Sequence, residues 1–571
     1  MAVRWRVVEA DERTVAELNQ SLALPEPLAR LLVARGISTS DEAERYFRKS
    51  LTDLQNPREL HGVEEASSRV ARAVTSQETV FVHGDFDADG ITATAVLTVF
   101  LRDLGCRVIP FVPNRLVEGH GIAERAIALA AVERASLLIT CDCGSSDRVA
   151  IGTLHASGID VVVTDHHHLT GASELGAILV NPKAAGGRGA CDDLSGAGVA
   201  FMLITAVRTK LRESGFFSGR PEPNLKDYLD IVALGTVADL APLVGQNRIL
   251  VAKGLEVLAV SRRPGIVAMR ETAGLGNAGS IGAEDVGFRL APRINAAARL
   301  GHAEEALNLL LEGDLLKAER MACDLEAWNL ERKTVQAQML RLATIEAERQ
   351  AGEEEPALIV GHESFHPGII GLVAQKLSES YRLPSVVFAL EGETVRGSGR
   401  SRFGIDLFGA LEACADLLVG FGGHREAGGC TLLRQHLPEF TRRFRAAVRQ
   451  QKNAAPRELS IDASLKFGQI NERFLSALDR FRPFGVGNPE PVFTTKARVV
   501  GQAKEMGKDH VRVTLVESGG PPVAAVGFGM WRSVGPVLRG DVEVAFTPEE
   551  NDWNGRREIR IRLQGVRPVQ L

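Results

Sequence analysis

The chain lacks any long apolar run and any recognisable export signal. Its longest apolar stretch, Gly198 to Val207, has about ten residues, whereas a membrane-spanning helix needs about 20. The first residues contain neither an apolar core nor a small-residue cleavage site, so no signal peptide is expected. These absences predict a cytoplasmic protein without membrane attachment.

Cysteine is scarce, and its spacing is irregular. The seven cysteines are an odd number and are spread along the whole chain. This excludes a small secreted scaffold held by disulfides and predicts free thiols in a reducing compartment. Cys141 and Cys143 flank Asp142, but no second cysteine pair lies near enough to indicate a zinc site.

The chain also lacks an excess of positive charge. Its 67 Lys and Arg residues face 72 Asp and Glu residues, a formal net charge of -5 that argues against a nucleic-acid partner. The average hides an asymmetry, because residues 451–571 carry 18 Lys and Arg against 14 Asp and Glu. The C-terminal part is therefore net basic. A hydrophobic content of 45% and a charged content of 24% exclude a disordered chain.

A length of 571 residues predicts about three or four domains, and strands alternate with helices in two separate α/β segments. The pattern of the first segment predicts a parallel sheet covered by helices on both faces. Hydrophobic residues that step by three and four predict a long connecting helix. The predicted parts are an N-terminal helical region (1–60), an α/β domain (61–313), the connecting helix (314–350), a smaller α/β domain (351–450) and a β-rich domain (458–571). The strands expected in the first α/β domain are 79–83, 107–112, 136–141 and 160–164.

The β-rich C-terminal part predicts a small barrel of the OB type. Five alternating or β-rich segments occur in about 110 residues, and Asn554-Gly555 marks a turn. Four arginines and one tryptophan gather at this turn, a combination that fits single-strand binding by phosphate contact and base stacking. The alternative is an ordinary charged β surface. These residues are Trp553, Arg556, Arg557, Arg560 and Arg562.

Three aspartates follow the first predicted strand. Asp85, Asp87 and Asp89 alternate with other residues, so in an extended segment they would project from one side of the backbone. Such close carboxylates raise one another's pKa unless a cation is bound. Oxygen ligands suit Mg²⁺ or Mn²⁺, and a neighbouring histidine favours Mn²⁺. A solvated acidic turn and a calcium loop are the alternatives.

Acidic residues end two further strands of the same predicted sheet. Asp142 follows one strand, and Asp165 with three consecutive histidines follows another. Ligands bind at the carboxyl ends of parallel strands, so these groups should converge on one rim. Asp239 ends an apolar helical segment, where a charge is costly unless it is paired or bound to metal. A helix or turn cap is the alternative for each aspartate taken alone.

These motifs resemble a known superfamily. Gly84-Asp-Phe-Asp-Ala-Asp-Gly90, Asp165-His166-His167 and Gly235-Thr-Val-Ala-Asp239 resemble the DHH phosphoesterases, and the whole chain is similar to the RecJ family of single-strand-specific DNA exonucleases within them. The similarity spans about residues 80 to 565. Further matching segments are Pro113-Asn-Arg115, Leu194-Ser-Gly-Ala-Gly-Val199, Leu290-Ala-Pro-Arg293-Ile-Asn295, His366-Pro-Gly, Gly397-Ser-Gly-Arg400, Gly422-Gly-His424 and Pro483-Phe-Gly-Val-Gly-Asn-Pro-Glu490.

The resemblance implies two Mn²⁺ or Mg²⁺ ions bridged by Asp142. One ion would be held by His83, Asp87 and Asp142, and the other by Asp89, Asp142, His166 and Asp239. Asp85 and His167 would orient ligands or the leaving phosphate. Arginines and glycine-rich turns suited to phosphate binding complete the expected site, although each arginine alone could equally be a solvated side chain. The substrate-binding candidates are Arg115, Arg293, Asn295, Arg299, His366, Ser398, Arg400, Gly423 and His424.

The activity implied by the resemblance is 5'-to-3' degradation of single-stranded DNA to 5'-mononucleotides, in DNA repair and recombination. Single-stranded DNA is the implied partner, together with a single-strand-binding protein and a RecQ-type helicase, and a monomer is expected. The rival enzyme is a DHH phosphodiesterase for short oligonucleotides or cyclic dinucleotides, which generally lacks a C-terminal barrel. A non-catalytic scaffold in a replication complex is the other rival, although such proteins typically lack metal ligands that this chain retains.

Overall fold

The computed structural model describes residues 4–169, 175–184, 191–276, 278–352, 355–402, 404–451, 458–553 and 556–569; the side chains of 551–557 are outside the description. The chain forms two compact units. One is Leu54–Ala455, and the other combines Met1–Asp53 with Pro456–Leu571. None of the described helices has the length and apolar character needed to cross a membrane.

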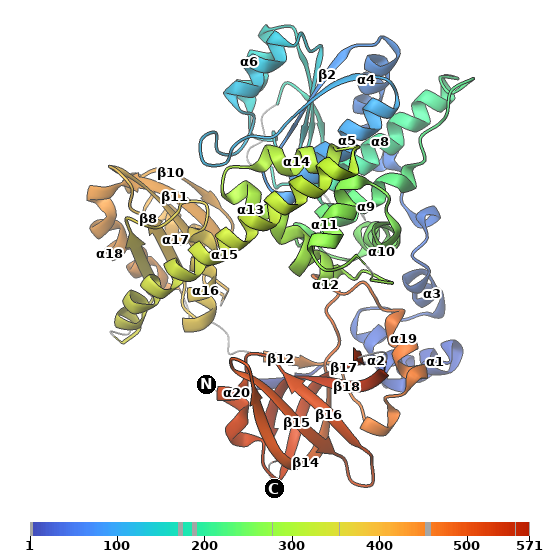
Figure 1. Ribbon diagram of the computed structural model, residues 1–571, viewed down its shortest axis with the longest axis vertical. Helices are drawn as coiled ribbons and strands as arrows, with labels where there is room; N and C mark the ends of the chain where they lie inside the picture. Colours follow the sequence, from blue (N-terminus) through green and yellow to red (C-terminus); the bar gives the residue numbers. More distant parts are fainter. Residues whose placement is uncertain are drawn as a thin grey trace. The chain divides into compact units, whose positions relative to one another are not determined.

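The first sheet of unit Leu54–Ala455 is fully parallel. Its strands are rich in buried Val, Ile, Leu and Phe, as expected for strands covered on both faces. Helices α6 (Glu124–Val132) and α7 (Arg148–Ala156) pack on one face, and α5 (Ala88–Asp103) and α8 (Gly196–Glu213) cover the other (Figure 1). The four strands expected from the sequence are present, together with a fifth at the edge. In spatial order they are β3 (Arg107–Phe111), β2 (Thr79–Gly84), β4 (Leu137–Cys141), β5 (Asp160–Thr164) and β6 (Ile178–Val180).

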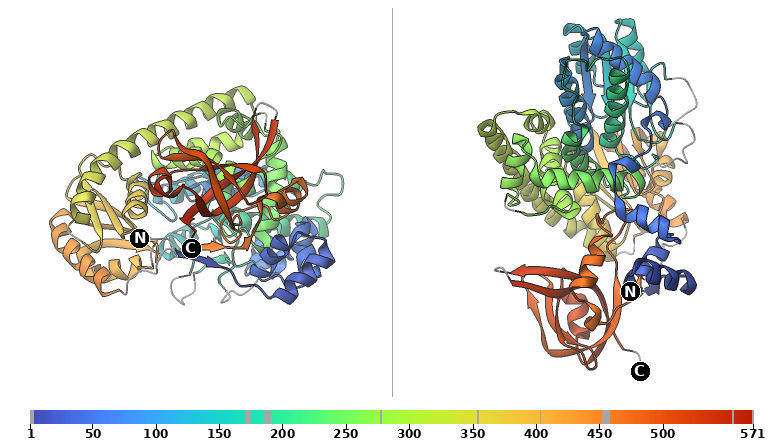
Figure 2. Two further views of the ribbon diagram at one scale, coloured as in Figure 1. Left: turned by 90° about the horizontal axis from the view of Figure 1, so that it is seen from below. Right: turned by 90° about the vertical axis from the view of Figure 1, so that its right-hand side faces the viewer.

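A helical layer follows the sheet and ends in one long helix. Helix α15 (Leu315–Gly352) has 38 residues. It packs first on α11 (Pro264–Thr272) and α13 (Ala291–Arg299) and then on α16 (Ile370–Tyr381) and β7 (Leu358–His362). It therefore runs from the first α/β part to the second, as Figure 2 shows in its left view. The other helices of this part are α4 (Val63–Thr75), α9 (Leu229–Ala238), α10 (Gly245–Val260), α11 (Pro264–Thr272), α12 (Ala283–Asp285), α13 (Ala291–Arg299) and α14 (Ala303–Leu311).

The second sheet is mixed. Strands β7 and β8 are parallel, and the other neighbours are antiparallel. Helix α16 (Ile370–Tyr381) packs with α15 on one face, and α17 (Leu407–Glu412) and α18 (Leu437–Gln450) close the core on the other. The spatial order is β10 (Leu418–Gly423), β11 (Ala427–Leu433), β9 (Thr394–Arg400), β8 (Ser385–Ala389) and β7 (Leu358–His362).

The second unit is built on a closed barrel. Pairing of β14 with β17 joins the ends of the sheet β14-β15-β16-β18-β17. The N-terminal helices share a core with the barrel, and β1 (Arg4–Val7) pairs with β12 (Glu458–Ile461). The sequence does not reveal this association, because the two segments lie at opposite ends of the chain. The remaining elements are α1 (Glu12–Leu22), α2 (Glu26–Ala34), α3 (Ser40–Arg48), β13 (Ala463–Ser464), α19 (Glu472–Asp479), β14 (Phe493–Met506), β15 (His510–Val516), β16 (Pro522–Gly527), α20 (Trp531–Val534), β17 (Asp541–Trp553) and β18 (Arg556–Pro568).

Candidate metal centre and phosphate site

Three aspartates extend neighbouring strands of the parallel sheet. The backbone N–H of Asp85 donates to Cys141 O at 3.0 Å, and that of Asp142 donates to Thr164 O at 2.9 Å. Asp165 continues the ladder in the same way, so the three carboxylates form a row at the carboxyl ends of β2, β4 and β5. Asp142 has a φ of +64°, a left-handed conformation unusual for a residue other than glycine. Such backbone strain is typical of functional positions.

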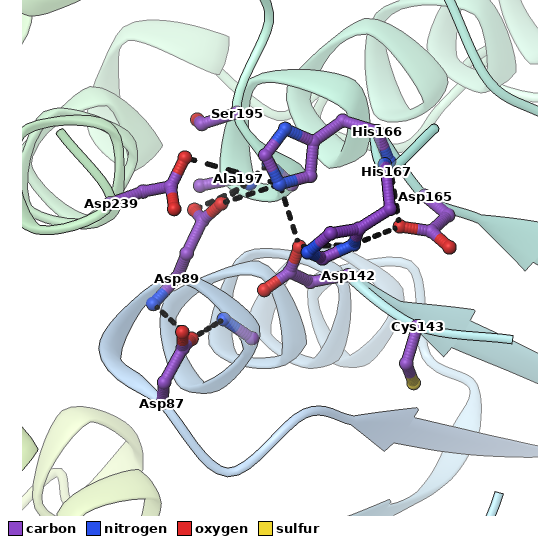
Figure 3. Close-up of polar contacts among 12 residues, drawn as sticks. Asp87, Asp89, Asp142, Cys143, Asp165, His166, His167, Ser195, Ala197 and Asp239 are labelled. Atoms are coloured by element: carbon purple, nitrogen blue, oxygen red, sulfur yellow. Dashed lines mark hydrogen bonds and ion pairs between the residues drawn. The ribbon is translucent and has the colours of Figure 1, made fainter. Parts of the chain in front are cut away.

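The carboxylate row is completed by the start of α5. This helix begins at Ala88, so Asp85, Asp87 and Asp89 do not lie on one side of an extended segment, the arrangement considered from the sequence. Asp87 instead caps the helix, and its Oδ1 accepts the N–H groups of Asp89 at 3.0 Å and of Gly90 at 3.1 Å. The first helical turn directs Asp89 toward the other groups of the cluster (Figure 3).

Helix α8 holds Asp89 at its N-terminus. The two carboxylate oxygens of Asp89 accept the N–H groups of Gly196 at 2.6 Å and of Ala197 at 2.9 Å. A Cβ atom on Gly196 would lie 2.7 Å from the Cβ atom of Asp142, so a side chain there would collide with the carboxylate row. The sequence of residues 194–199 resembles a family motif but predicts no role for this segment. In the structure, Gly196 and Ala197 of the segment fix the position of Asp89.

His166 lies at the centre of the cluster. Its Nε2 atom is 3.0 Å from Asp142 Oδ1 and 3.9 Å from an oxygen of both Asp89 and Asp239 (Figure 3). Asp239 reaches this point from the C-terminal end of α9. Nε2 of His166 and Oδ1 of Asp142 are buried, and although they lie 3.0 Å apart, neither forms a hydrogen bond of acceptable geometry with the other or with another described group. Buried polar atoms without partners are costly, and a shared cation would satisfy both.

The geometry defines three overlapping ligand groups. In each group one candidate atom per residue lies within 4.8 Å of the others. Asp142 and His166 each belong to two groups. The two oxygens of Asp142 could bridge neighbouring ions, whereas the Nε2 atom of the neutral His166 could bind only one. Carboxylate oxygens with imidazole suit Mg²⁺ and, more closely, Mn²⁺. The groups are Asp85–Asp87–Asp142, Asp89–His166–Asp239 and Asp142–His166–His167.

The electrostatics of the cluster favour a bound cation. Burial, reinforced by the charge of Asp87, raises the pKa of Asp85 to about 8 and that of Asp89 to about 7. Burial, reinforced by Asp89, raises the pKa of Asp239 to about 8, and burial with the surrounding aspartates raises the pKa of Asp142 well above its ordinary value. A divalent ion would reverse these shifts by stabilising the ionised carboxylates.

The two histidines of the motif have opposite character. The Nδ1 atom of His167 lies 2.8 Å from Asp165 Oδ1, and this hydrogen bond raises the pKa of His167 to about 9. Burial opposes ionisation of Asp165, but His167 and neighbouring donors outweigh it and lower the pKa of that carboxyl. Burial, with the charge of His167, lowers the pKa of His166 to about 3. His166 is therefore neutral, the form that binds metals, whereas His167 is a cation.

His83 belongs to none of the three ligand groups within the described part of the chain. Its Nε2 atom accepts the N–H of Ala123 at 3.2 Å, and its Nδ1 atom is 3.6 Å from Cys143 Sγ. Burial lowers the pKa of His83 to about 4. Both ring nitrogens thus have other partners, a geometry that does not support the ligand role expected for His83. Asp85 occurs in the corresponding group instead.

Two connected cavities adjoin the cluster. The first, of about 530 Å³, is lined by cluster carboxylates and by Arg115, Asn295 and Arg299. The second, of about 870 Å³, extends over strands β9–β11. Arg115, His120 and His167 line both. Besides Arg115, four residues expected from the sequence line the second cavity: Ser398, Arg400, Gly423 and His424.

Three arginines face these cavities without a carboxylate partner. Arg115 packs over the Phe86 ring at 4.9 Å, Arg299 donates to Gly368 O at 3.2 Å, and Arg400 donates to Ser398 Oγ at 3.1 Å. Over the ranges that the structure covers, none of the three forms an ion pair. Burial lowers the pKa of each, and repulsion by Arg115 and Arg400 contributes to bringing the pKa of Arg299 to about 9. Buried like charges of this kind call for an anion.

Other predicted residues have supporting positions. Asn295 lines the first cavity, and its Oδ1 accepts the N–H of Ala88 at 3.1 Å, which fixes the start of α5. Arg293 pairs with Glu326 at 2.7 Å on α15 and lines neither cavity, contrary to the expected substrate contact. His366 lines neither cavity; its Nδ1 accepts the N–H of Gly368. His120 was missed, because a lone histidine in a loop gives no sequence signal.

The predicted basic hairpin of the barrel is only partly described. Arg560 pairs with Glu549, and Arg562 pairs with Glu490 and Glu549. Their charges are therefore compensated locally. The side chains of Trp553, Arg556 and Arg557 lie outside the described residues, so their predicted role in strand binding stays a prediction.

Comparisons with known proteins agree with this architecture. Family models match residues 79–236 (DHH family, N-terminal domain), 354–450 (DHHA1 domain) and 461–565 (RecJ OB domain). The single-stranded-DNA-specific exonuclease RecJ of Dickeya dadantii is 35% identical over 99% of this chain and 100% of its own length. The chain belongs to the RecJ family. RecJ of Escherichia coli is 34% identical over 99% of both chains.

Solved RecJ structures extend the comparison to three dimensions. The crystal structure of RecJ from Thermus thermophilus in complex with Mn²⁺ matches with a TM-score of 0.84 and 31% identity, covering 100% of this chain and 80% of that one. A complex of the same protein with Mg²⁺ matches with a TM-score of 0.79. These matches confirm the predicted fold class, an α/β RecJ architecture with a C-terminal OB barrel.

Proposed function

We propose that this RecJ-family chain is a metal-dependent exonuclease that degrades single-stranded DNA in the 5'-to-3' direction to 5'-mononucleotides. One observation carries the proposal: a buried carboxylate and imidazole cluster shares connected cavities with three arginines that lack carboxylate partners. A phosphodiester needs both parts, because its oxygens must be neutralised while water attacks phosphorus. The names of the relatives support the same activity.

The cluster would hold two Mn²⁺ or Mg²⁺ ions. Asp85, Asp87 and Asp142 form one ligand group, and Asp89, His166 and Asp239 form the other. Bound divalent ions supply a water of lowered pKa and neutralise the attacking and leaving oxygens. The N-terminus of α8 fixes Asp89, and Asp165 fixes His167 beside the cluster. As a cation, His167 is suited to contact a phosphate oxygen or to protonate the leaving 3'-oxygen.

The arginines would account for the proposed 5'-to-3' direction of degradation. Arg115, Arg299 and Arg400 would hold the terminal 5'-phosphate. The hydroxyl of Ser398 accepts a hydrogen bond from the guanidinium group of Arg400. Anchoring this end would place the first internal phosphodiester at the metal centre, so each cycle would release one 5'-mononucleotide. Gly423 and His424 line the same cavity and could contact the following nucleotide.

The confined cavities would also set strand preference, since a duplex is wider than a single strand. The OB barrel favours long strands as substrates over cyclic dinucleotides and very short oligonucleotides, the substrates of the alternative DHH phosphodiesterase function. A monomer in the cytoplasm would suffice for the reaction. A helicase would generate the single-stranded substrate, and a single-strand-binding protein would coat it.

One assay tests the proposal directly. The protein is incubated with Mn²⁺ and single strands labelled at either end, beside a duplex and beside an Asp142→Ala variant. We expect early release of the 5' label as a mononucleotide, little duplex cleavage and no activity in the variant. Degradation that begins at the 3' end, or that survives Asp142→Ala, would contradict the mechanism.

A further inference from the structure

The aromatic and basic residues of the OB barrel are not distributed as the sequence suggests. On β17 and β18 the described arginines pair with carboxylates: Arg560 with Glu549, Arg562 with Glu490 and Arg567 with Glu543. A phosphate that approached this surface would compete with ion pairs already formed. The described part of this face is therefore poorly suited to supply the binding energy for a strand.

A second surface of the barrel carries cations without such partners. It consists of Lys504, Lys508, Arg512, Phe528 and Arg532, and we call it the hairpin–loop surface. Lys504 and Arg512 are register partners on β14 and β15 and are exposed, whereas Val511 and Val513 on either side of Arg512 point into the core. None of its four cations forms an ion pair within the part of the chain that is described.

Hydrogen bonds attach the loop after β16 to the β14–β15 turn. The N–H of Gly529 donates to His510 Nδ1 at 3.0 Å, and the N–H of Trp531 donates to Asp509 O at 3.0 Å. The N–H of Arg532 donates to Asp509 Oδ1 at 2.7 Å, so that carboxylate is used in capping α20. Phe528 and Arg532 are thereby held beside the hairpin.

Phe528 is the exposed aromatic group of this surface. Its side chain is 55% exposed, and its ring is braced edge-on by His510 at 5.4 Å between centroids. Two carboxylates lie nearby: Asp509, which caps α20, and Glu505, which accepts the N–H of Asp509. An exposed, braced ring among unpaired cations is the arrangement on which bases stack while phosphates are neutralised.

We infer that the hairpin–loop surface is the single-stranded-DNA-binding face of the barrel, with Phe528 stacking on a base and Lys504 and Arg512 contacting phosphates. The inference deepens the proposed function and rests on it. The β17–β18 hairpin, which the composition of the sequence favoured, is the competing surface. The two alternatives differ in the residues whose removal weakens binding.

The test measures binding by the full chain in EDTA, where cleavage is suppressed, to a 3'-labelled oligo-dT longer than the roughly 4–16 nucleotides that one OB barrel covers. Fluorescence anisotropy is recorded over a salt series. Phe528→Ala should raise Kd about fivefold or more, as expected for loss of one stacked base. The double substitution Lys504→Gln with Arg512→Gln should make the negative slope of log K against log salt shallower by about 1.4, because each phosphate contact on a single strand contributes about 0.7.

The matched control is Lys496→Gln with Arg498→Gln. Both side chains also point outward on β14, and the double substitution removes the same charge. Arg498 is already paired with Asp541. The control should bind nearly as the parent does. Parent-like binding by the Phe528 and Lys504/Arg512 variants, or an equal loss in the control, would overturn the inference. Unchanged thermal unfolding excludes misfolding as the cause of any loss.

A second measurement separates this inference from the proposed function. Hydrolysis of a 5'-phosphorylated tetranucleotide with Mn²⁺ depends on the catalytic cavity and should stay unchanged in the barrel variants. If the parent protein hydrolyses no strand, the proposed function fails, while the binding data still decide which barrel face holds DNA. If the parent cleaves and the barrel variants bind long strands normally, only the barrel inference fails.

Discussion

Removal of divalent ions should destabilise the catalytic unit progressively between about pH 6.5 and pH 8. Carboxyls with an ordinary pKa of 3.8 are fully ionised in the unfolded chain over this range. In the folded protein, burial with neighbouring charge raises the pKa of Asp85 and of Asp239 to about 8 and that of Asp89 to about 7. The folded state therefore binds more protons, and its stability falls as pH rises.

Other titrating groups do not reverse this sign. The folded-state pKa values of His83 and His166 are lowered by burial to about 4 and about 3, so they affect stability only below the ordinary histidine value of 6.5. His167, with a pKa raised to about 9 by Asp165, loses its stabilising contribution across the same range. It acts in the same direction as the carboxyls.

The magnitude follows from the number of retained protons. Each one costs about 1.4 kcal/mol per pH unit, so two carboxyls that stay largely protonated would cost on the order of 3–4 kcal/mol over the range. For a unit of this size that lowers Tm by several degrees. Saturating Mn²⁺ should abolish the loss, because metal binding displaces the protons.

Calorimetry in EDTA and in Mn²⁺ at three pH values measures the effect. Asp85→Asn should flatten the EDTA slope, whereas Asp416→Asn, which removes an exposed carboxylate paired with Arg443, should leave it unchanged. A Tm in EDTA that stays level or rises from pH 6.5 to pH 8 would refute the reasoning. So would a metal-induced rise in Tm that shrinks as pH increases.

Three substitutions test individual contacts. Gly196→Ala should lower kcat at least about 100-fold, which is the scale of losing one preorganised group. It should also weaken Mn²⁺ binding measured by calorimetry. The control Gly152→Ala, where a Cβ meets nothing within 4 Å, should change neither quantity. Asp165→Asn should move the alkaline limb of the pH–rate profile below the value of about 9 set by the pKa of His167, and an unmoved limb would exclude His167 as the titrating group. Arg400→Gln should raise KM about 10-fold or more for 5'-phosphorylated strands, as expected for a lost charge-assisted hydrogen bond, and leave 5'-hydroxyl strands unaffected; equal effects on both would rule out a 5'-phosphate contact.

Local sequence patterns were sufficient to predict that the acidic residues share one rim of the sheet. Alternation of strands and helices predicted the parallel sheet, and parallel strands bring their carboxyl ends together. Asp142 and the Asp165–His167 motif could therefore be assigned to the same edge as Asp85 without a structure. The direction of Asp89 was missed, because the spacing of the three aspartates does not reveal that a helix begins at Ala88. The ligand role expected for His83 is not supported, because its ring nitrogens have other partners.

Contacts between distant segments could not be predicted from such patterns. The N-terminus of α8 binds Asp89 across more than a hundred residues of sequence, and Arg293 is drawn to Glu326 on α15. An arginine beside a matched motif looks the same in sequence whether it faces a cavity or a carboxylate. Arg293 and Arg299 lie on the same helix, α13, and only the packing of α15 assigns them different roles.

The same reasoning applies to charge on the barrel. A count of basic residues treats Arg560 and Arg512 as equivalent, yet Arg560 pairs with Glu549 from the neighbouring strand and Arg512 has Lys504 opposite. The strand register places Arg560 beside a carboxylate, so this pair is locally neutral. It leaves Arg512 exposed beside the like charge of Lys504, which is unfavourable unless an anion binds. Uncompensated cations recur at both proposed contacts with DNA, the cavity arginines and the hairpin–loop surface. Both proposed contacts therefore rest on unpaired charge and not on net charge.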